Sequence, residues 1–512
     1  MTVATSLVEL RSALGVALDE AAALGGRAAA DHFQRAVESA MPHGAPIAVQ
    51  HLRNRLLAYV DGKGFRHQPE VGFKPRMRGE IKAAVDGLDQ ALLGHFRPIH
   101  SVARKSERGK RVLLLVDHLP VRDRMFSHTR QICTYAATLA LDPNIEAICI
   151  LATQETAPEN PFRAAGEVGS AHEAGWRAEV EEVAGGPVPK IQFFTPERLG
   201  PVRPYEESIG RVRKFDPDIV FSHEGIFRSR LLPSLLHPQA AIVAVQMNQI
   251  NPEPPYADLV LAHGRSEDFS HQPTPSRWRA HCVPLIPFPK ERSIDPVELG
   301  PPSPLRVVTV LTLGRLEKGL MKDDAAGLKF VISFLEDHVD AVWLLVAIED
   351  PKAFSEVIAP YVPSAVAERL RLMPVVPDLR AIFEHCHIYM HLPSLGGGNM
   401  GIAMAIDEGV PVLAREGTDG ANTLHPEQTY AHEKQAARIL RRLAREPELR
   451  ARRLSRQQTK IKRDHSIQSL SVAFGSFLPE ALASFEARRT APPPRPPAPE
   501  PRQRDRQPML AG

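Results

Sequence analysis

Three consecutive glycines and an asparagine are the residues of this sequence whose types and spacing best suit chemistry. They lie in HLPSLGGGNMGIAMAIDEGVPVL, residues 391–413, between a short apolar run and an amphipathic one. A strand, a glycine loop and a helix N-terminus in succession can bind an anion, because free backbone N–H groups and the helix dipole face it. The residues that would form this cradle are Gly396, Gly397, Gly398, Asn399 and Gly401.

The glycine loop matches neither of two common phosphate-binding motifs. No Gly-Lys-Ser/Thr follows it, as it would in a P-loop, and it does not have the G-x-G-x-x-G spacing of a dinucleotide-binding fold. Three interpretations therefore remain: a phosphate cradle, a nucleotide-sugar pocket or a tight turn.

Two cations, Arg315 and Lys318, follow the apolar run RVVTVLTL in the segment GRLEKGL. Lysine offers a point charge and arginine a two-pronged fork, and both suit a diphosphate. If the apolar run opens an α/β unit, these side chains lie at the carboxyl edge of its sheet, where ligands of such sheets bind.

A histidine and an aspartate follow another apolar run, RVLLLVDHL, near residue 111. Asp123 and His128 lie in the segment PVRDRMFSHTRQI. Either side chain could accept a proton from a reacting hydroxyl or amide, and histidine titrates closest to neutral pH. His128 could equally cap the helix predicted to follow it.

The elements that must position these residues are short apolar runs alternating with amphipathic segments. Runs such as RVLLLVDHL, IEAICILAT and AVWLLVAI are typical of strands buried on both faces of a parallel sheet. The proline-rich stretch 282–305 interrupts the alternation, which then restarts. The sequence therefore predicts an α/β fold with two parallel-sheet domains. The predicted units are a helical N-terminal domain over 1–100, α/β domains over 105–285 and 300–485, and a disordered proline-rich tail over 488–512.

Composition narrows the class of protein further. The chain has 512 residues, 43% of them hydrophobic, and its net charge of +3 leaves no global nucleic-acid footprint. Its four cysteines lie far apart with no C-x-x-C pair, so neither a zinc knuckle nor a disulfide framework is indicated. No basic n-region precedes an apolar core at the N-terminus, and no apolar run approaches the ~20 residues of a membrane span. We expect a cytoplasmic protein that neither binds nucleic acid nor spans a membrane.

Two groups of possible metal ligands are set aside. Asp216 and Asp218 form a D-x-D, but they precede an apolar run, whereas a metal-binding pair at the carboxyl edge of a sheet would follow one. His385, His387 and His391 would share one face of a strand, with no second shell to support zinc. We expect no metal site.

The two α/β halves, the segment GRLEKG and the glycine loop followed by a helix and Gly-x-Pro-Val resemble the two-domain (GT-B) glycosyltransferases over roughly residues 110–480. The first half, with LLLVDHLPVRDRMFSHTRQI and DIVFSHEGIFRSRLLPSLLHPQAAIVAVQMNQ, is most similar to the O-linked N-acetylglucosaminyltransferases and the bacterial protein N-glycosyltransferases. The resemblance implies two Rossmann-like domains and metal-independent, inverting transfer from a UDP-linked sugar to a protein or glycan. Arg315 and Lys318 would contact the diphosphate, and His128 would be the active-site histidine. The sugar nucleotide would be a co-substrate, with no further cofactor, and the N-terminal helices would dock the acceptor or a partner.

The sequence departs from the families at two places. The two glutamates of the large retaining branch would fall at Gly396 and Met404, and both are absent. The aspartate that holds the ribose in the branch above would fall at Ala403 or Met404, so Asp407 and Glu408, about one helical turn further on, are the nearest candidates. The alternatives are a retaining envelope-polysaccharide transferase, or a non-catalytic scaffold with a degenerate sugar-nucleotide site.

Overall fold

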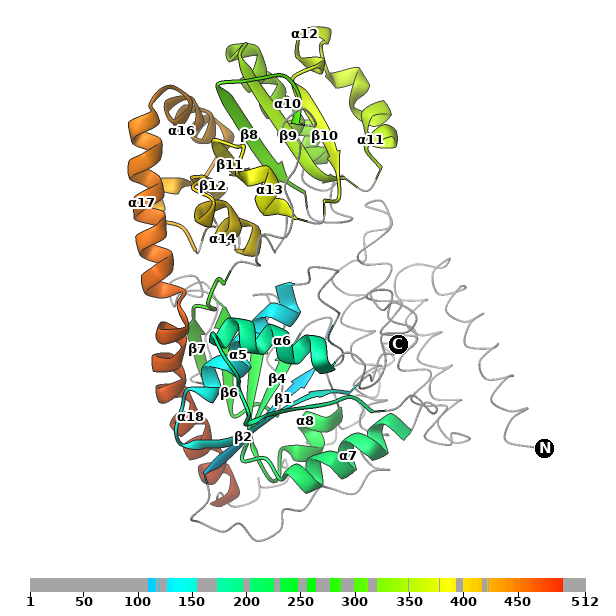
Figure 1. Cartoon of the computed structure of the whole chain (residues 1–512), viewed down its shortest axis with the longest axis vertical. Helices are drawn as coiled ribbons and strands as arrows, with labels where there is room; N and C mark the ends of the chain where they lie inside the picture. Colours follow the sequence, from blue (N-terminus) through cyan, green and yellow to red (C-terminus); the bar gives the residue numbers. More distant parts are fainter. Residues whose placement is uncertain are drawn as a thin grey trace, which may run out of the picture.

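The computed structural model describes residues 109–116, 119, 127–153, 173–196, 203–224, 231–246, 256–263, 277–286, 299–311, 320–348, 350–376, 378–392, 399–416, 421 and 423–490. Within these ranges the chain forms two α/β domains, each built on a parallel sheet (Figure 1). The predicted fold class is confirmed for this part of the chain. The predicted helical domain, 1–100, lies outside the described residues. Residues 488–490 of the predicted disordered tail, 488–512, are instead the end of a helix, and the rest of the tail lies outside the described residues.

The first domain contains a seven-stranded sheet in the order β3-β2-β1-β4-β5-β6-β7, all parallel. Its strands are buried on both faces because they are almost wholly aliphatic. Residues 112–116 of β1, for example, are all fully buried. The strands are β1 (Lys110–Val116), β2 (Ile145–Ala152), β3 (Ile191–Phe194), β4 (Ile219–Glu224), β5 (Ala241–Gln246), β6 (Leu259–His263) and β7 (Trp278–His281).

Helices cover both faces of the first sheet. Alternate residues of each strand point to opposite faces, so Val112 and Leu114 pack into one core while Leu113 and Leu115 pack into another. The helices α5 (Ser127–Ala140) and α6 (Glu173–Ala184) cover the first face, and α7 (Arg203–Phe215) and α8 (Leu231–Leu236) cover the second.

The second domain contains a six-stranded parallel sheet in the order β10-β9-β8-β11-β12-β13. Its strands are β8 (Leu305–Val310), β9 (Ala341–Ile348), β10 (Leu370–Pro374), β11 (Ile388–His391), β12 (Val412–Arg415) and β13 (Thr429–Tyr430). Its helices are α10 (Lys322–Asp337), α11 (Pro351–Ile358), α12 (Ser364–Ala367), α13 (Leu379–Phe383), α14 (Asn399–Asp407), α16 (Glu433–Arg445) and α17 (Pro447–Asp464), with short 3₁₀ turns at Ala359–Tyr361 and Pro426–Gln428. The cores on the two faces of this sheet are again separate.

The last helix, α18 (Ile467–Thr490), follows α17 in the chain but packs against the first domain. Its residues Leu470, Phe474 and Phe485 belong to the same core as β1 and α5. Near its end, Arg488 forms an ion pair with Asp258 at the start of β6, with Nε 2.9 Å from Oδ1. Figure 1 shows α17 and α18 running in succession along one side of both domains. The range expected for the second domain, 300–485, therefore contains most of α18, although this helix packs against the first domain.

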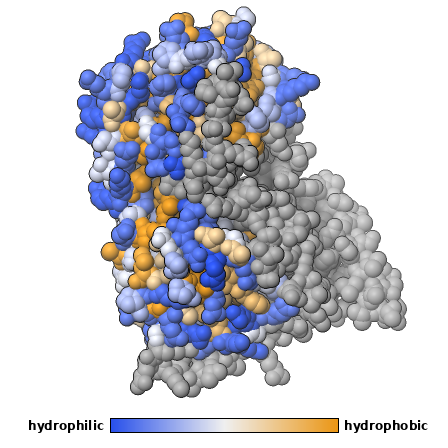
Figure 2. Space-filling model, in the orientation of Figure 1, coloured by the Kyte–Doolittle hydropathy of each residue, from blue (hydrophilic) through white to orange (hydrophobic). Residues whose placement is uncertain are grey.

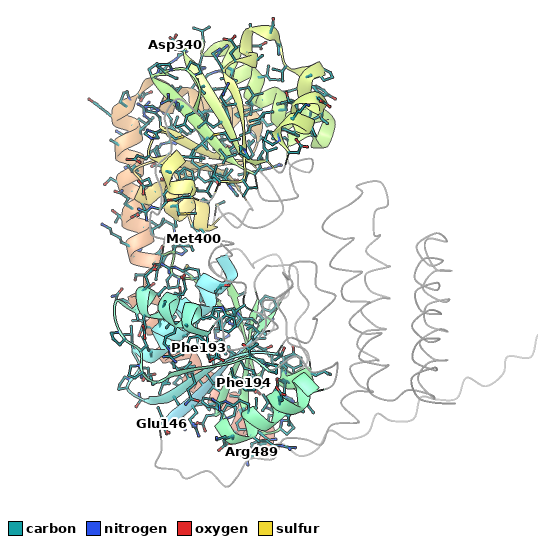
Figure 3. All side chains as sticks on the ribbon, turned by 45° about the vertical axis from the view of Figure 1, so that its right-hand side comes forward. Glu146, Phe193, Phe194, Asp340, Met400 and Arg489 are labelled. Carbon is teal, nitrogen blue, oxygen red and sulfur yellow. The ribbon has the colours of Figure 1, made fainter. Side chains whose placement is uncertain are left out.

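The carboxyl edges of the two sheets face one another. In Figure 3, Asp340, just before β9, lies on the outer side of the second domain, and Glu146, near the start of β2, lies on the outer side of the first. Met400, at the start of α14, lies on the side of the second domain that faces the first. Figure 2 shows hydrophilic residues over the outer surfaces of both domains, and hydrophobic residues gathered near the place where the two domains meet.

The D-x-D aspartate Asp218 serves the sheet. It is buried at the amino edge, where its Oδ2 accepts a hydrogen bond from the backbone N–H of Arg111 at 2.8 Å. Asp258 does the same for Ile242 at 2.9 Å, two strands further on. Each carboxylate satisfies the first unpaired donor of a neighbouring strand, which is a structural use of an acidic residue.

We predict that Asp218→Ala lowers the free energy of unfolding by about 1–3 kcal/mol, because the buried N–H of Arg111 loses its acceptor. Asp218→Asn should cost less, since the amide oxygen can still accept. The matched control is Glu146→Ala, which removes an exposed carboxylate from the same edge. Chemical denaturation measures all three, and equal stability of Asp218→Ala and wild type would contradict the assignment.

Candidate functional site

The residues predicted to act on the acceptor lie at the start of α5. His128 is the second residue of this helix, which follows β1 in the chain. Asp123 lies outside the described residues. Since β1 occupies the middle of the sheet and its carboxyl end faces the second domain, the first turn of α5 lies on the side of the first domain where a ligand would be expected.

The residues predicted to bind the donor lie between β11 and α14, or after β8. Asn399 begins α14 and Gly401 is in its first turn, so the predicted helix start is observed. Arg315, Lys318 and the glycines 396–398 lie outside the described residues. β8 and β11 are adjacent and parallel, so the two loops that carry these residues leave neighbouring strands at the same edge.

Gly401 lies against the phenol of Tyr389, on β11. A Cβ at Gly401 would come no closer than 3.5 Å to the Tyr389 hydroxyl, which is ordinary van der Waals contact. Packing of α14 on the sheet therefore does not itself require a glycine here. Burial raises the pKa of Tyr389 well above its usual value, so the phenol stays neutral.

Two of the three histidines set aside as zinc ligands, His387 and His391, have separate partners. Nδ1 of His387 accepts a hydrogen bond from the backbone N–H of Arg306 at 3.0 Å. Nδ1 of His391 lies 3.2 Å from the Tyr389 hydroxyl, at the other end of β11. Across the described ranges, no group of three histidine, cysteine or acidic side chains is placed to hold a metal ion.

Asp407 and Glu408 lie at the end of α14 opposite the glycine loop. Arg380 of α13 bridges them, with Nη2 2.6 Å from Asp407 Oδ2 and Nε 2.5 Å from Glu408 Oε1. A nine-residue helix is about 13 Å long, so these carboxylates are a full helix length from the predicted phosphate cradle. Their contacts fit a role in fixing α14 to α13.

Arg130 anchors the start of α5 and was not anticipated from the sequence. Its side chain is only 2% exposed, and its guanidinium lies 2.6 Å from Glu179 and 2.9 Å from Glu182, both on α6. Its Nε also donates to the carbonyl oxygen of Ile286, at 3.3 Å. No spacing rule connects partners 49 and 156 residues away, so the sequence offered no signal for this interaction.

Ile286 belongs to the segment that leaves the first domain, and this segment is also tied to the junction of α17 and α18. His465, buried between those helices, donates from Nδ1 to the carbonyl oxygen of Val283 at 2.9 Å. The backbone N–H of Leu285 donates to the carbonyl oxygen of His465 at 3.1 Å. The outgoing segment, the returning helices and α5 therefore meet at one place.

Comparison with known proteins identifies the fold. No family model matches the sequence, and no curated protein is similar to it. The solved structure of a mutant of the Thermobaculum terrenum O-GlcNAc transferase is similar with a TM-score of 0.51 and 14% identity, over 90% of this chain and 81% of that one. A glycosyltransferase from Rickettsia africae ESF-5 is similar with a TM-score of 0.49 and 12% identity, over 73% of this chain and 99% of that one. The sucrose-phosphate synthase of Thermosynechococcus elongatus is similar with a TM-score of 0.45 and 11% identity, over 73% of this chain and 100% of that one.

At 14% identity the likeness to the first of these structures shows the fold, which is the two-domain GT-B arrangement that the sequence resemblance predicted. Both parallel sheets are present, of seven and six strands. Among the described residues, no helix is long and apolar enough to cross a bilayer.

The contacts of Asp407 lead to a prediction about nucleotide binding. If the start of α14 binds a nucleotide, Asp407→Asn should leave that affinity within about twofold of wild type, because this carboxylate is engaged by Arg380. A carboxylate that held the ribose would contribute about 1.5–3 kcal/mol, and its loss would weaken binding tenfold or more. Isothermal titration calorimetry distinguishes the two.

Arg380→Ala should in turn lower the free energy of unfolding by about 1–3 kcal/mol, since it leaves the mostly buried Glu408 without its partner. The control is Arg445→Ala, which removes an exposed arginine from α16. Equal effects of the two substitutions would contradict a structural role for Arg380.

The junction of α17 and α18 should be sensitive to acid. Hydrogen bonds from Arg463 and then Lys460 hold the pKa of the Asp464 carboxyl well below its usual value. A depressed carboxyl pKa stabilises the folded state above the unfolded value, which is about 3.9, and the stabilisation is lost as the pH falls below it. The stability difference between wild type and Asp464→Asn should therefore be full at pH 6 and shrink below about pH 4.

The control for this measurement is Asp337→Asn, which breaks an exposed ion pair with Arg441. Exposed pairs contribute only about 0–1 kcal/mol, so this substitution should change stability little at any pH. A difference between wild type and Asp464→Asn that does not vary with pH would contradict the prediction.

Proposed function

We propose that this protein is a glycosyltransferase that moves a sugar from a UDP-linked donor to a protein or glycan acceptor. The observation that carries the proposal is the pairing of two facing sheet edges. The edge of the second domain presents the start of α14, and the edge of the first presents the start of α5. Ligands of parallel α/β sheets bind at such edges, and a two-substrate reaction needs one edge for each substrate.

On the donor side, the start of α14 and the loop before it would receive the diphosphate. The backbone N–H groups of Gly396, Gly397, Gly398, Asn399 and Gly401 would face the anion, together with the positive end of the helix dipole. Arg315 and Lys318, on the loop after the adjacent β8, would neutralise the charge that grows on the leaving group. These groups supply electrostatic stabilisation without a metal ion or a further cofactor.

On the acceptor side, His128 or Asp123 would take the proton. The acceptor oxygen or nitrogen attacks the anomeric carbon of the sugar, and the bond from that carbon to the diphosphate oxygen breaks. The bonding electrons leave with the nucleotide diphosphate, and the acceptor proton passes to the base. Attack from the face opposite the leaving group gives inversion. Closure of the domains would exclude water and so limit hydrolysis of the donor.

A cytoplasmic location is part of the proposal. Its support is the state of the cysteines. Cys133, Cys149 and Cys386 are buried free thiols, and burial raises the pKa of each well above its usual value, which keeps it protonated and unreactive. Thiols of this kind are usual in a reducing compartment. The N-terminal segment, 1–100, would dock the acceptor or a partner protein.

The first test is thermal stabilisation by UDP, GDP, ADP and their sugar conjugates. A ligand at about 100 times its dissociation constant adds roughly 2.7 kcal/mol to the free energy of unfolding, which raises the melting temperature measurably. We expect a shift with UDP or a UDP-sugar that is lost in Lys318→Ala and kept in Lys434→Ala, an exposed lysine of α16.

Turnover separates the enzyme from the alternatives. Lys318→Ala should abolish transfer while the melting temperature without ligand stays unchanged. Product with retained anomeric configuration would favour the retaining transferase. No shift with any nucleotide and no transfer would overturn the proposal in favour of a scaffold.

A further inference from the structure

A buried tyrosine connects α5 to the edge of the first sheet. Tyr135 is fully buried, and its hydroxyl is hydrogen-bonded to Nε2 of His281, the last residue of β7. Nδ1 of His281 lies 3.1 Å from the carbonyl oxygen of Ala262, on β6. A carbonyl oxygen only accepts, so Nδ1 carries the proton and donates it. In the neutral ring Nε2 is then the acceptor, and the Tyr135 hydroxyl is the donor.

The direction of the hydrogen bond from Tyr135 to His281 determines the direction of the hydrogen bond between Tyr135 and Gln131. Because the hydroxyl proton of Tyr135 is directed at His281, its oxygen is left to accept, and Nε2 of Gln131 lies 3.3 Å away. Gln131 therefore presents its amide N–H₂ here and keeps its amide oxygen on the other side. Burial raises the pKa of Tyr135 well above its usual value, so the phenol remains a donor across neutral pH.

The three side chains form a directional chain of hydrogen bonds. Gln131 donates to Tyr135, Tyr135 donates to His281, and His281 donates to the backbone of β6. The aromatic ring of Tyr135 packs on three more rings, with centroid distances of 6.4 Å to Phe221, 5.6 Å to His223 and 5.5 Å to Phe474. Tyr135 is thus held by two strands and by α18, and it cannot move without them.

The hydrogen-bond chain ends on α5, about one helical turn from the backbone of His128. Gln131 comes three residues after His128 on α5, and residues three apart lie on the same side of a helix. A shift of α5 would therefore move the backbone that carries His128.

We propose that Gln131, Tyr135 and His281 are positioning residues that fix the first turn of α5 for proton removal from the acceptor. The inference rests on the proposed function for its meaning in catalysis. The hydrogen-bond chain places the backbone of His128 relative to the carboxyl edges of β6 and β7.

The first experiment is Tyr135→Phe, which removes one hydroxyl and keeps the ring and its packing. We expect kcat to fall about tenfold or more, because misplacing a reacting group by 1 Å can cost ~100-fold. The KM for the donor should stay within about twofold, because the donor binds to the other domain. A purely structural hydroxyl would lower the melting temperature without this split between kcat and KM.

A conservative variant provides the rescue. His281→Gln keeps an acceptor for Tyr135 and a donor for Ala262, whereas His281→Leu has neither. We expect His281→Gln to retain most of the wild-type kcat and His281→Leu to fall as far as Tyr135→Phe. The matched control is Tyr256→Phe, which removes the hydroxyl of a buried tyrosine on the opposite face of the same sheet and should not change kcat.

Hydrogen–deuterium exchange tests the positioning without any activity. In full-length Tyr135→Phe, amides in the first two turns of α5 should exchange several-fold faster, while those of α10 in the second domain stay unchanged. Unchanged exchange in α5 would overturn the proposal, whatever the activity. Faster exchange in α5 with an unchanged kcat would also overturn the proposal, because the hydrogen-bond chain would then have only a structural role.

If the wild-type protein shows no transfer activity, that result counts against the proposed function alone. Hydrogen–deuterium exchange in α5 then decides whether the hydrogen-bond chain positions this helix. The two failures are therefore distinguishable.

Discussion

Both domains depend on one pair of consecutive helices, α17 and α18. The buried side chain of Gln457 on α17 exchanges two hydrogen bonds with the backbone of Val412 on β12, at 3.1 and 2.8 Å. Just after the junction, α18 enters the core of the first domain through Leu470 and Phe474. Neither helix can leave its domain without exposing apolar surface or unpaired buried polar groups. The separation of the two sheets is therefore constrained by a rigid element packed at both ends.

The same two helices also contact α14 and α5, the helices that begin at the proposed active site. Nε2 of Gln458 on α17 donates to the carbonyl oxygen of Ile406 on α14, at 3.3 Å, and Phe474 of α18 packs edge-on against Tyr135 of α5. Any rotation of one domain must bend this pair or slide it over one sheet. Residues 465 and 466 lie between them, and the buried His465 ties this junction to the outgoing chain.

The sequence predicted the parts of the fold that depend on local patterns. Continuous aliphatic runs such as that of β1 and β9 identify buried parallel strands, and Gly409 followed by Pro411 marks the end of α14. It could not predict which domain α18 joins, because an amphipathic helix does not specify the surface that covers it. The roles of Arg130 and Arg380 were also missed, since their partners are distant in sequence. Two adjacent carboxylates such as Asp407 and Glu408 are also common in ligand sites, but in the fold both form ion pairs with Arg380.

The direction of the strands explains at which edge of a sheet the residues that flank each strand lie. Asp218 and Asp258 precede their strands, so they lie at amino edges and hold neighbouring backbones in register. His128 and Gly401 follow strands, so they lie near carboxyl edges, where ligands of parallel α/β sheets bind. Position relative to the nearest apolar run therefore indicates at which edge of the sheet a residue lies, which its residue type does not. In a parallel sheet this order can be seen in the sequence alone, because every strand runs the same way and each crossover returns the chain to the same edge.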